Sequence, residues 1–222
     1  MGKIRGQQVD NEFIKWKRAN VNIKRRLNAR AIYELIALKT LLYKTTPEKY
    51  HSRDRALLSL LYLTAGRISE VLMLKKSQFD FESDQDFIII RDMQVVKRTK
   101  KTIAKYGLPL REVPLPLKGQ LAPFTKLVVE YLDRIEKDSM LFPSTKKSRP
   151  HISRIRAWQI IYGITGKWCH YFRSQAESHY GRVFRDVIAL ADFVRVVNIQ
   201  TLSEYVKTNW QDYRRELSRQ LC

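Results

Sequence analysis

The sequence has few cysteines, few histidines and no long apolar run, and each scarcity excludes a class of protein. Cys169 and Cys222 are the only two cysteines, too few for a disulfide framework. The four histidines show no zinc-ligand spacing, so no metal site is expected. No stretch reaches the roughly 20 apolar residues of a membrane helix, and the N-terminus lacks a signal-peptide core. These absences predict a soluble cytoplasmic protein with no membrane partner.

Acidic residues are also scarce relative to basic ones. The 222 residues include 42 Lys plus Arg against 22 Asp plus Glu, which gives a formal net charge of +20. A field of this size attracts polyanions, so the charge favours a nucleic-acid partner. Ribosomal and membrane-surface proteins share such a balance, and a merely basic protein is the alternative that the charge leaves open.

Hydrophobic periodicity predicts a mainly α-helical fold with one small antiparallel β-sheet. A strand is expected near 87–96 and its return partner at 110–115, joined by a long cationic tip. The segment 1–28, rich in Lys and Arg, reads as a basic arm or linker. Apolar residues recur at helical spacing in the remaining elements, which are expected at 29–44, 54–63, 68–74, 117–138 and 152–164, with two or three helices over 171–193 and a short helix that carries Tyr205.

Two arginines and a late tyrosine carry the chemistry that the sequence suggests. Arg67 lies in the run Thr64-Ala-Gly-Arg-Ile-Ser-Glu70, and Arg173 follows His170 by three residues and precedes Tyr205 by 32. Two guanidiniums clamp a phosphodiester by bidentate hydrogen bonds, and a phenol can attack it. The pattern therefore points to covalent chemistry on a nucleic-acid backbone.

In these segments the chain resembles the catalytic domain of tyrosine recombinases of the lambda-integrase type. The resemblance rests on Leu60-Leu-Tyr-Leu-Thr-Ala-Gly-Arg-Ile-Ser-Glu-Val-Leu72, on His170-Tyr-Phe-Arg173 and on Ile199-Gln-Thr-Leu-Ser-Glu-Tyr205. Their order, their spacing and the intervening hairpin all fit, over roughly residues 29–222. The resemblance implies a catalytic domain at 29–205, double-stranded DNA as partner, a dimer to tetramer on DNA and no cofactor.

The resemblance also implies a role for each residue of the motifs. Arg67 and Arg173 would stabilise the charge that develops on the phosphate, and Glu70, three residues after Arg67, would orient it. Tyr205 would be the nucleophile that forms a 3′-phosphotyrosyl intermediate, so the enzyme would be a site-specific recombinase or integrase. His170 would accept or relay the tyrosine proton.

In the family a lysine of the β-hairpin protonates the leaving 5′-oxygen. Lys97 is the expected acid because it directly follows the strand, and Lys100 and Lys101 are its rivals. The other basic residues of the two loops would contact DNA phosphates. This nucleic-acid-binding set comprises Arg98, Lys100, Lys101, Lys146, Lys147 and Arg149.

The sequence departs from the family pattern in two places. The family normally has a histidine or tryptophan nine residues before the nucleophile, where this chain has Val196. Arg195 or His179 are the candidates to replace its contact with the phosphate. The helical core-binding domain that usually precedes the catalytic domain is missing or reduced to 1–28.

Three other functions stay open at this point. A type IB topoisomerase would share the catalytic residues, and Val196 leaves room for a DNA-binding regulator on a decayed recombinase scaffold. An RNA-binding or ribosome-associated protein would require the ordered motifs to be coincidence.

The tail at 206–222 carries an apolar stripe that would either pack on its own domain or dock on a neighbouring subunit.

Overall fold

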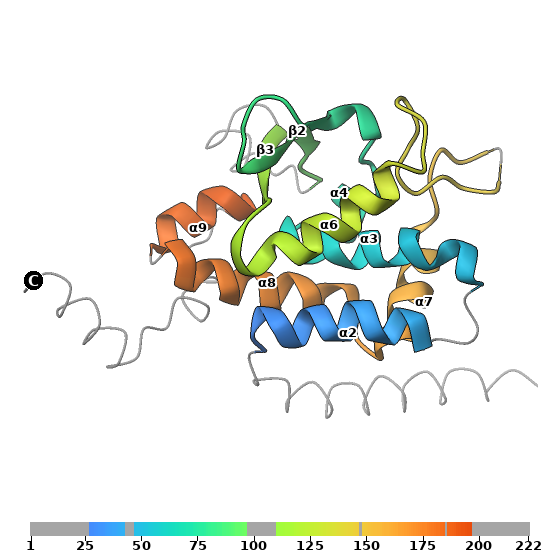
Figure 1. Cartoon of the computed structure of the whole chain (residues 1–222), viewed down its shortest axis with the longest axis horizontal. Helices are drawn as coiled ribbons and strands as arrows, with labels where there is room; N and C mark the ends of the chain where they lie inside the picture. Colours follow the sequence, from blue (N-terminus) through green and yellow to red (C-terminus); the bar gives the residue numbers. More distant parts are fainter. Residues whose placement is uncertain (1–26, 43–46, 97–109, 147, 185, 197–222) are drawn as a thin grey trace, which may run out of the picture.

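The structure is a computed structural model, and it describes residues 27–42, 47–96, 110–146, 148–184 and 186–196. The predicted arm, the hairpin tip, the segment with Tyr205 and the tail lie outside these residues. Within them, helices form most of the molecule and a three-stranded sheet lies along one side (Figure 1). The expected mainly α fold with a small antiparallel sheet is confirmed. The helices are α2 (Ala29–Leu42), α3 (His51–Leu63), α4 (Ile68–Leu72), α6 (Ala122–Leu132), α7 (Arg154–Thr165), α8 (Cys169–Phe184) and α9 (Val187–Val194), with 3₁₀ turns at Glu48–Tyr50, Lys76–Gln78 and Gly119–Leu121.

Helix α3 is the centre of the core. Every residue from Ala56 to Leu63 is buried, and the helix packs against α2, α6 and α8. A helix that is buried on all sides needs no polar face, which explains its nearly continuous leucine content. The turn that follows α3 therefore starts from one of the most firmly packed points of the molecule.

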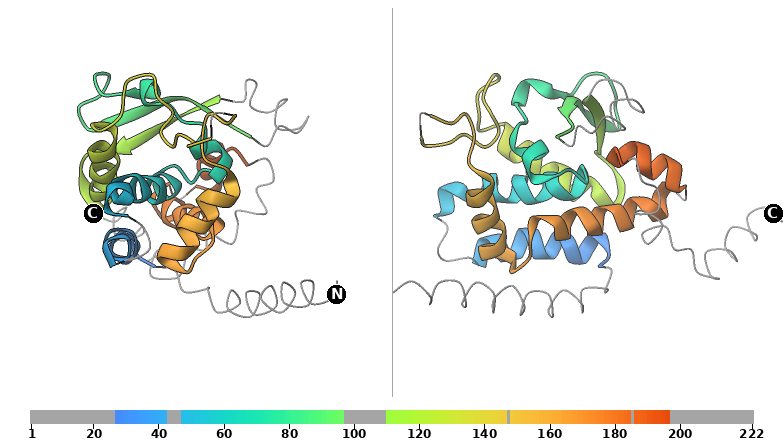
Figure 2. Two further views of the ribbon diagram at one scale, coloured as in Figure 1. Left: turned by 90° about the vertical axis from the view of Figure 1, so that its right-hand side faces the viewer. Right: turned by 180° about the vertical axis from the view of Figure 1, so that it is seen from behind.

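The sheet has the antiparallel order β1 (Phe79–Asp80), β2 (Phe87–Gln94), β3 (Leu110–Pro116). The side view shows it above the helical layer (Figure 2). The two longer strands were predicted, whereas β1 was not, because two residues are too short to show an alternating pattern. The register shifts between Ile90 and Met93, and Asp92 has φ 52° there. This bulge returns Met93 to the buried face that Ile90 occupies.

The helix predicted at 117–138 is shorter than expected. Gly119 has φ 74°, a left-handed conformation through which an α-helix cannot continue, so α6 begins after it. Pro123 lies in the first turn of α6, where the backbone N–H has no acceptor within the helix and its absence is not destabilising. The helix ends at Leu132, and the following residues form turns. The apolar periodicity beyond these limits arises from turn residues, such as Ile135, that pack against the core.

The C-terminal helical region consists of two helices in the part of the chain that is described. The first, α8, begins at Cys169, so His170 and Arg173 both lie on it. The second, α9, packs on α8 through an aromatic cluster of Tyr180, Phe184 and Phe193. Among the described residues, no helix is long and apolar enough to cross a membrane.

Candidate active site

A tight turn places Arg67 at the end of the central helix. The Thr64 hydroxyl donates to the Leu60 carbonyl (2.6 Å) and accepts from the N–H of Gly66 (3.0 Å). A β-carbon on Gly66 would lie 2.7 Å from the Thr64 hydroxyl and 2.9 Å from the Met93 side chain, so only glycine fits. The turn thus fixes the backbone that enters α4.

Glu70 accepts hydrogen bonds from both the backbone and the side chain of Arg67. One carboxylate oxygen accepts the backbone N–H of Arg67 and the other accepts its Nη1, both at 2.9 Å. Glu70 is buried, whereas the Arg67 side chain remains 29% exposed. The predicted contact between Arg67, the residue before α4, and Glu70 is therefore present, and the Arg67 side chain keeps part of its surface exposed.

The same carboxylate also reaches the segment that follows β2. The backbone N–H of Val96 donates to Glu70 Oε1 at 3.3 Å. Val96 is the last described residue before Lys97, which lies outside the described residues together with Arg98, Lys100 and Lys101. Glu70 therefore joins Arg67 to the point at which the cationic hairpin tip begins.

Arg173 is the second predicted phosphate ligand, and it is buried. Its Nε donates to Glu177 one turn later on α8 at 2.8 Å, and its Nη2 donates to the Val194 carbonyl at 3.5 Å. Burial raises the pKa of Glu177 against the opposing charge and hydrogen bond of Arg173. Among the described residues, Arg173 Nη1 is buried and has no hydrogen-bond partner.

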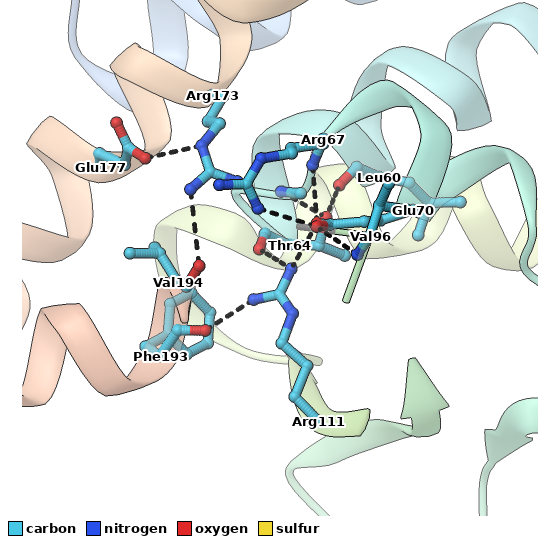
Figure 3. A network of polar contacts seen from close by, with 11 residues as sticks. Leu60, Thr64, Arg67, Glu70, Val96, Arg111, Arg173, Glu177, Phe193 and Val194 are labelled. Carbon is cyan, nitrogen blue, oxygen red and sulfur yellow. Dashed lines mark hydrogen bonds and ion pairs between the residues drawn. The ribbon is translucent and has the colours of Figure 1, made fainter. Parts of the chain in front are cut away.

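The side chains of Arg67 and Arg173 extend toward each other from α4 and α8 (Figure 3). The electrostatic influence of Arg67 also reaches Glu177, the partner of Arg173. Two guanidiniums from segments about a hundred residues apart in the sequence therefore share one site, as the motif order predicts. Such a pair suits an anion with several oxygens.

A third arginine in the site, Arg111 on β3, was missed by the sequence interpretation. It is buried, and it donates to the carbonyls of Thr64 (2.9 Å) and Phe193 (2.6 Å) and pairs with Glu70 at 3.8 Å. Desolvation lowers its pKa to about 10, against the attraction of Glu70, so it stays charged at neutral pH. The signal available in the sequence was a lone arginine at an inward position of an alternating strand.

His170 lies near both predicted phosphate ligands. The residue keeps solvent access. Desolvation of the ring, together with the charges of Arg173 and Arg67, lowers the pKa of His170 below its ordinary value. This shift favours the neutral ring, which has a nitrogen that can accept a proton.

The remaining predicted residues divide into two groups. Lys146 and Arg149 lie exposed in the loop between α6 and α7, as expected of phosphate contacts. Lys147 and Tyr205 lie outside the described residues. No group of three or more His, Cys, Asp or Glu with metal-binding geometry occurs in the described part of the chain.

Val196, at the family's histidine position, and His179, one of the two candidates to replace the histidine, have different surroundings. Val196 packs against the core, and its N–H donates to the Ala191 carbonyl at 2.9 Å. The His179 ring packs near the rings of Tyr62 and Tyr180, at 6.1 and 5.7 Å between centroids. Both aromatic partners belong to the buried core, so His179 is poorly placed to contact a phosphate.

The comparisons with known proteins agree with the fold. The phage integrase family model matches residues 34–212. The XerH site-specific recombinase bound to difH substrate, in a pre-cleavage complex, has a TM-score of 0.59 and 17% identity, with 87% of this chain and 53% of that chain covered. XerA recombinase has a TM-score of 0.54 and 18% identity, with 83% and 61% covered.

The Tn1549 transposon integrase in complex with a circular intermediate DNA has a TM-score of 0.50 and 14% identity, with 82% and 62% covered. No curated protein matches the chain. The chain spans between 53% and 62% of the length of these solved proteins. The predicted resemblance in fold is confirmed.

Proposed function

Because the chain belongs to the phage integrase family, we propose that it is a site-specific DNA recombinase that cleaves and rejoins strands through a covalent 3′-phosphotyrosyl intermediate. This makes it a DNA strand transferase, with Tyr205 as the nucleophile. XerH in its complex is bound to difH substrate, and the Tn1549 integrase to a circular intermediate DNA. By analogy, double-stranded DNA is the partner that we propose for this chain.

The observation that carries the proposal is the buried Nη1 of Arg173, which has no hydrogen-bond partner among the described residues. A buried guanidinium nitrogen without a partner among the described residues is costly unless a ligand satisfies it. Among the described residues, the three guanidiniums of Arg67, Arg111 and Arg173 pair with two carboxylates, those of Glu70 and Glu177. A phosphodiester would supply both the missing negative charge and the missing acceptor.

The proposed reaction is an exchange of one phosphoester bond for another. The Tyr205 oxygen attacks phosphorus, its proton passes to His170, and the bond from phosphorus to the 5′-oxygen breaks. Lys97 donates a proton to that oxygen, and Arg67 and Arg173 stabilise the charge on the non-bridging oxygens. Attack by a 5′-hydroxyl reverses these steps and restores the tyrosine, so no external energy source is needed.

Strand exchange requires more than one copy of the active site. We therefore propose that the chain acts as a dimer to tetramer on DNA, with its tail at 206–222 as the candidate docking segment. The alternative for the tail is packing on its own domain. Deletion of 209–222 separates the two, because a soluble, cooperatively folded protein that cleaves DNA but does not assemble on two sites supports docking.

The proposal is tested with a duplex selected from a randomised pool by its affinity for the protein. A nick placed near the cleavage position lets the short product diffuse away, so the covalent adduct accumulates on a denaturing gel. Tyr205→Phe should bind the duplex with unchanged affinity and form no adduct, because only the attacking oxygen is lost. Arg182→Ala, which removes an exposed arginine of α8, is the matched control and should form adduct normally.

The outcomes also separate the alternatives. Tight DNA binding with no adduct from the unaltered protein would favour a DNA-binding regulator on a decayed scaffold, the alternative that Val196 suggests. Relaxation of supercoiled DNA by a monomer without a defined site would favour a topoisomerase. Adduct on a defined duplex, followed by exchange between two duplexes, supports a recombinase.

A further inference from the structure

The residue that directly follows α9 has an unusual backbone conformation. Arg195 has φ 53° and ψ 53°, which is the left-handed helical region. Its N–H donates to the Asp192 carbonyl at 3.3 Å, and that of Val196 donates to the Ala191 carbonyl at 2.9 Å. This pair of bonds is the Schellman motif that ends many helices.

Glycine is the usual residue at this position, because a β-carbon in the left-handed region crowds the neighbouring carbonyl. The chain follows this rule at the end of α7, where Gly166 has φ 64° and its N–H donates to the Tyr162 carbonyl at 2.7 Å. At the end of α9 the chain has arginine instead. The fold alone would be better served by glycine, so the side chain of Arg195 requires another explanation.

The position of Arg195 supplies one. The two carbonyls directly before it, those of Phe193 and Val194, accept hydrogen bonds from Arg111 (2.6 Å) and Arg173 (3.5 Å). The backbone of Arg195 is therefore anchored beside two buried guanidiniums (Figure 3 shows both contacts). The half-buried Arg195 adds a further cation to this cluster, and its charge contributes to the lowered pKa of Arg111 after desolvation and Arg173.

Like charges gathered at a partly buried point repel one another, and they persist where an anion balances them. Arg195 thus adds electrostatic repulsion to backbone strain, directly after the carbonyls that hold Arg111 and Arg173. Arg173 Nη1 is buried and has no hydrogen-bond partner among the described residues. Neither of the other residues near the family's histidine position fits this role, since Val196 is apolar and His179 packs on core aromatic rings.

We propose that Arg195 is a further catalytic residue, a third guanidinium that contacts a non-bridging oxygen of the scissile phosphodiester together with Arg67 and Arg173. The inference rests on the proposed DNA cleavage and deepens it. In the family, the histidine or tryptophan at the position of Val196 makes this contact. The inference assigns the contact to Arg195, one position earlier in the chain. It also explains why a strained arginine replaces glycine at the end of α9.

The test uses the full chain and the nicked duplex on which the unaltered protein forms its adduct. Arg195→Gly should leave the melting temperature unchanged or raise it, because glycine relieves the strain. Its rate of adduct formation should fall by about 10²–10³-fold, the effect of removing one transition-state donor. Arg195→Lys should lose less, since it keeps the charge, and Arg195→Asn, which tolerates the left-handed region, guards against an unexpected folding defect in the glycine variant.

A methylphosphonate at the scissile position distinguishes a catalytic role of Arg195 from a purely structural one. It replaces one charged non-bridging oxygen by a methyl group, so the cation that balances this oxygen becomes dispensable for one of its two stereoisomers. On that isomer the deficit of Arg195→Gly should shrink to less than about tenfold. An equal deficit on both substrates, or full cleavage of the ordinary phosphate by Arg195→Gly, would overturn the inference while leaving the proposed function intact. Failure of the unaltered protein to form adduct would contradict both the inference and the proposed function.

Discussion

The two arginine–glutamate pairs of the site differ in what each carboxylate holds. Glu70 accepts from the backbone and side chain of Arg67 and from Val96, and it pairs with the buried Arg111. Glu177 holds Arg173 alone among the contacts that the structure describes. The first carboxylate joins three segments of the chain, whereas the second aims one side chain. We infer that the Glu70 pair governs the assembly of the site and that the Glu177 pair governs the orientation of one phosphate ligand.

The largest expected effect is on stability, and it distinguishes the two carboxylates. Glu70→Ala leaves Arg111 buried without a countercharge, which should lower the free energy of unfolding by about 3–5 kcal/mol. Glu177→Ala also leaves a buried arginine without its carboxylate, but it should cost less, because Glu70 additionally accepts the N–H groups of Arg67 and Val96. Urea unfolding of both variants measures the difference. Equal losses would contradict the greater structural role assigned to Glu70.

The next effect concerns catalysis by Arg173. Arg173→Lys keeps a positive charge but cannot satisfy Glu177, the Val194 carbonyl and a phosphate at the same time. Single-turnover adduct formation should fall by about 10²–10³-fold, with DNA affinity nearly unchanged. Arg182→Lys, on the exposed side of the same helix, should cleave at the normal rate. Unimpaired cleavage by Arg173→Lys would remove Arg173 from the phosphate site.

A smaller effect is expected in the pH dependence of cleavage. His170 must be neutral to accept a proton, so the rate should fall as the pH drops through its pKa. Because desolvation and the charges of Arg173 and Arg67 lower that pKa, the fall should lie below about 6.5. The rate–pH profile of His170→Gln should lack this acid limb. An acid limb above about 7, or one that persists in the variant, would argue against His170 as the base.

The smallest effect concerns the exposed loop residues. If Lys146 and Arg149 each neutralise one phosphate, their joint replacement by alanine should reduce the slope of log affinity against log salt by about 0.9 per lost contact. The control is Lys126→Ala with Lys137→Ala, which removes the same charge from other exposed positions. Identical slopes for both double variants would show that only net charge matters and that this loop makes no specific contact.

The sequence was sufficient to predict the features that have a periodic or motif signal. The helices around α3, the two long strands and the motif of Arg67 all lie close to their predicted places. Strand β1 has two residues and therefore no period to detect, and α6 is shorter than its apolar pattern because turns beyond its ends also pack on the core. Local pattern reading fails where tertiary contacts rather than periodicity decide the structure.

Arg111 illustrates a second limit of sequence reading. The alternation of Leu110–Pro116 places Arg111 on the same face as Val113 and Leu115, but it does not reveal what Arg111 contacts, because its partners lie 41 to 82 positions away in the chain. Its importance follows from three acceptors that the fold brings together. The same holds for Arg195, whose strain and neighbours are properties of the folded chain and not of its local sequence.

The most direct test of the central claim is to locate the covalent bond itself. The adduct formed on the nicked duplex is digested with protease and nuclease, and the modified peptide is identified by mass spectrometry. We expect a single nucleotide attached through its 3′-phosphate to Tyr205, with a 5′-hydroxyl on the released strand. Attachment to another residue such as Tyr213, or through a 5′-phosphate, would contradict the mechanism proposed for this site.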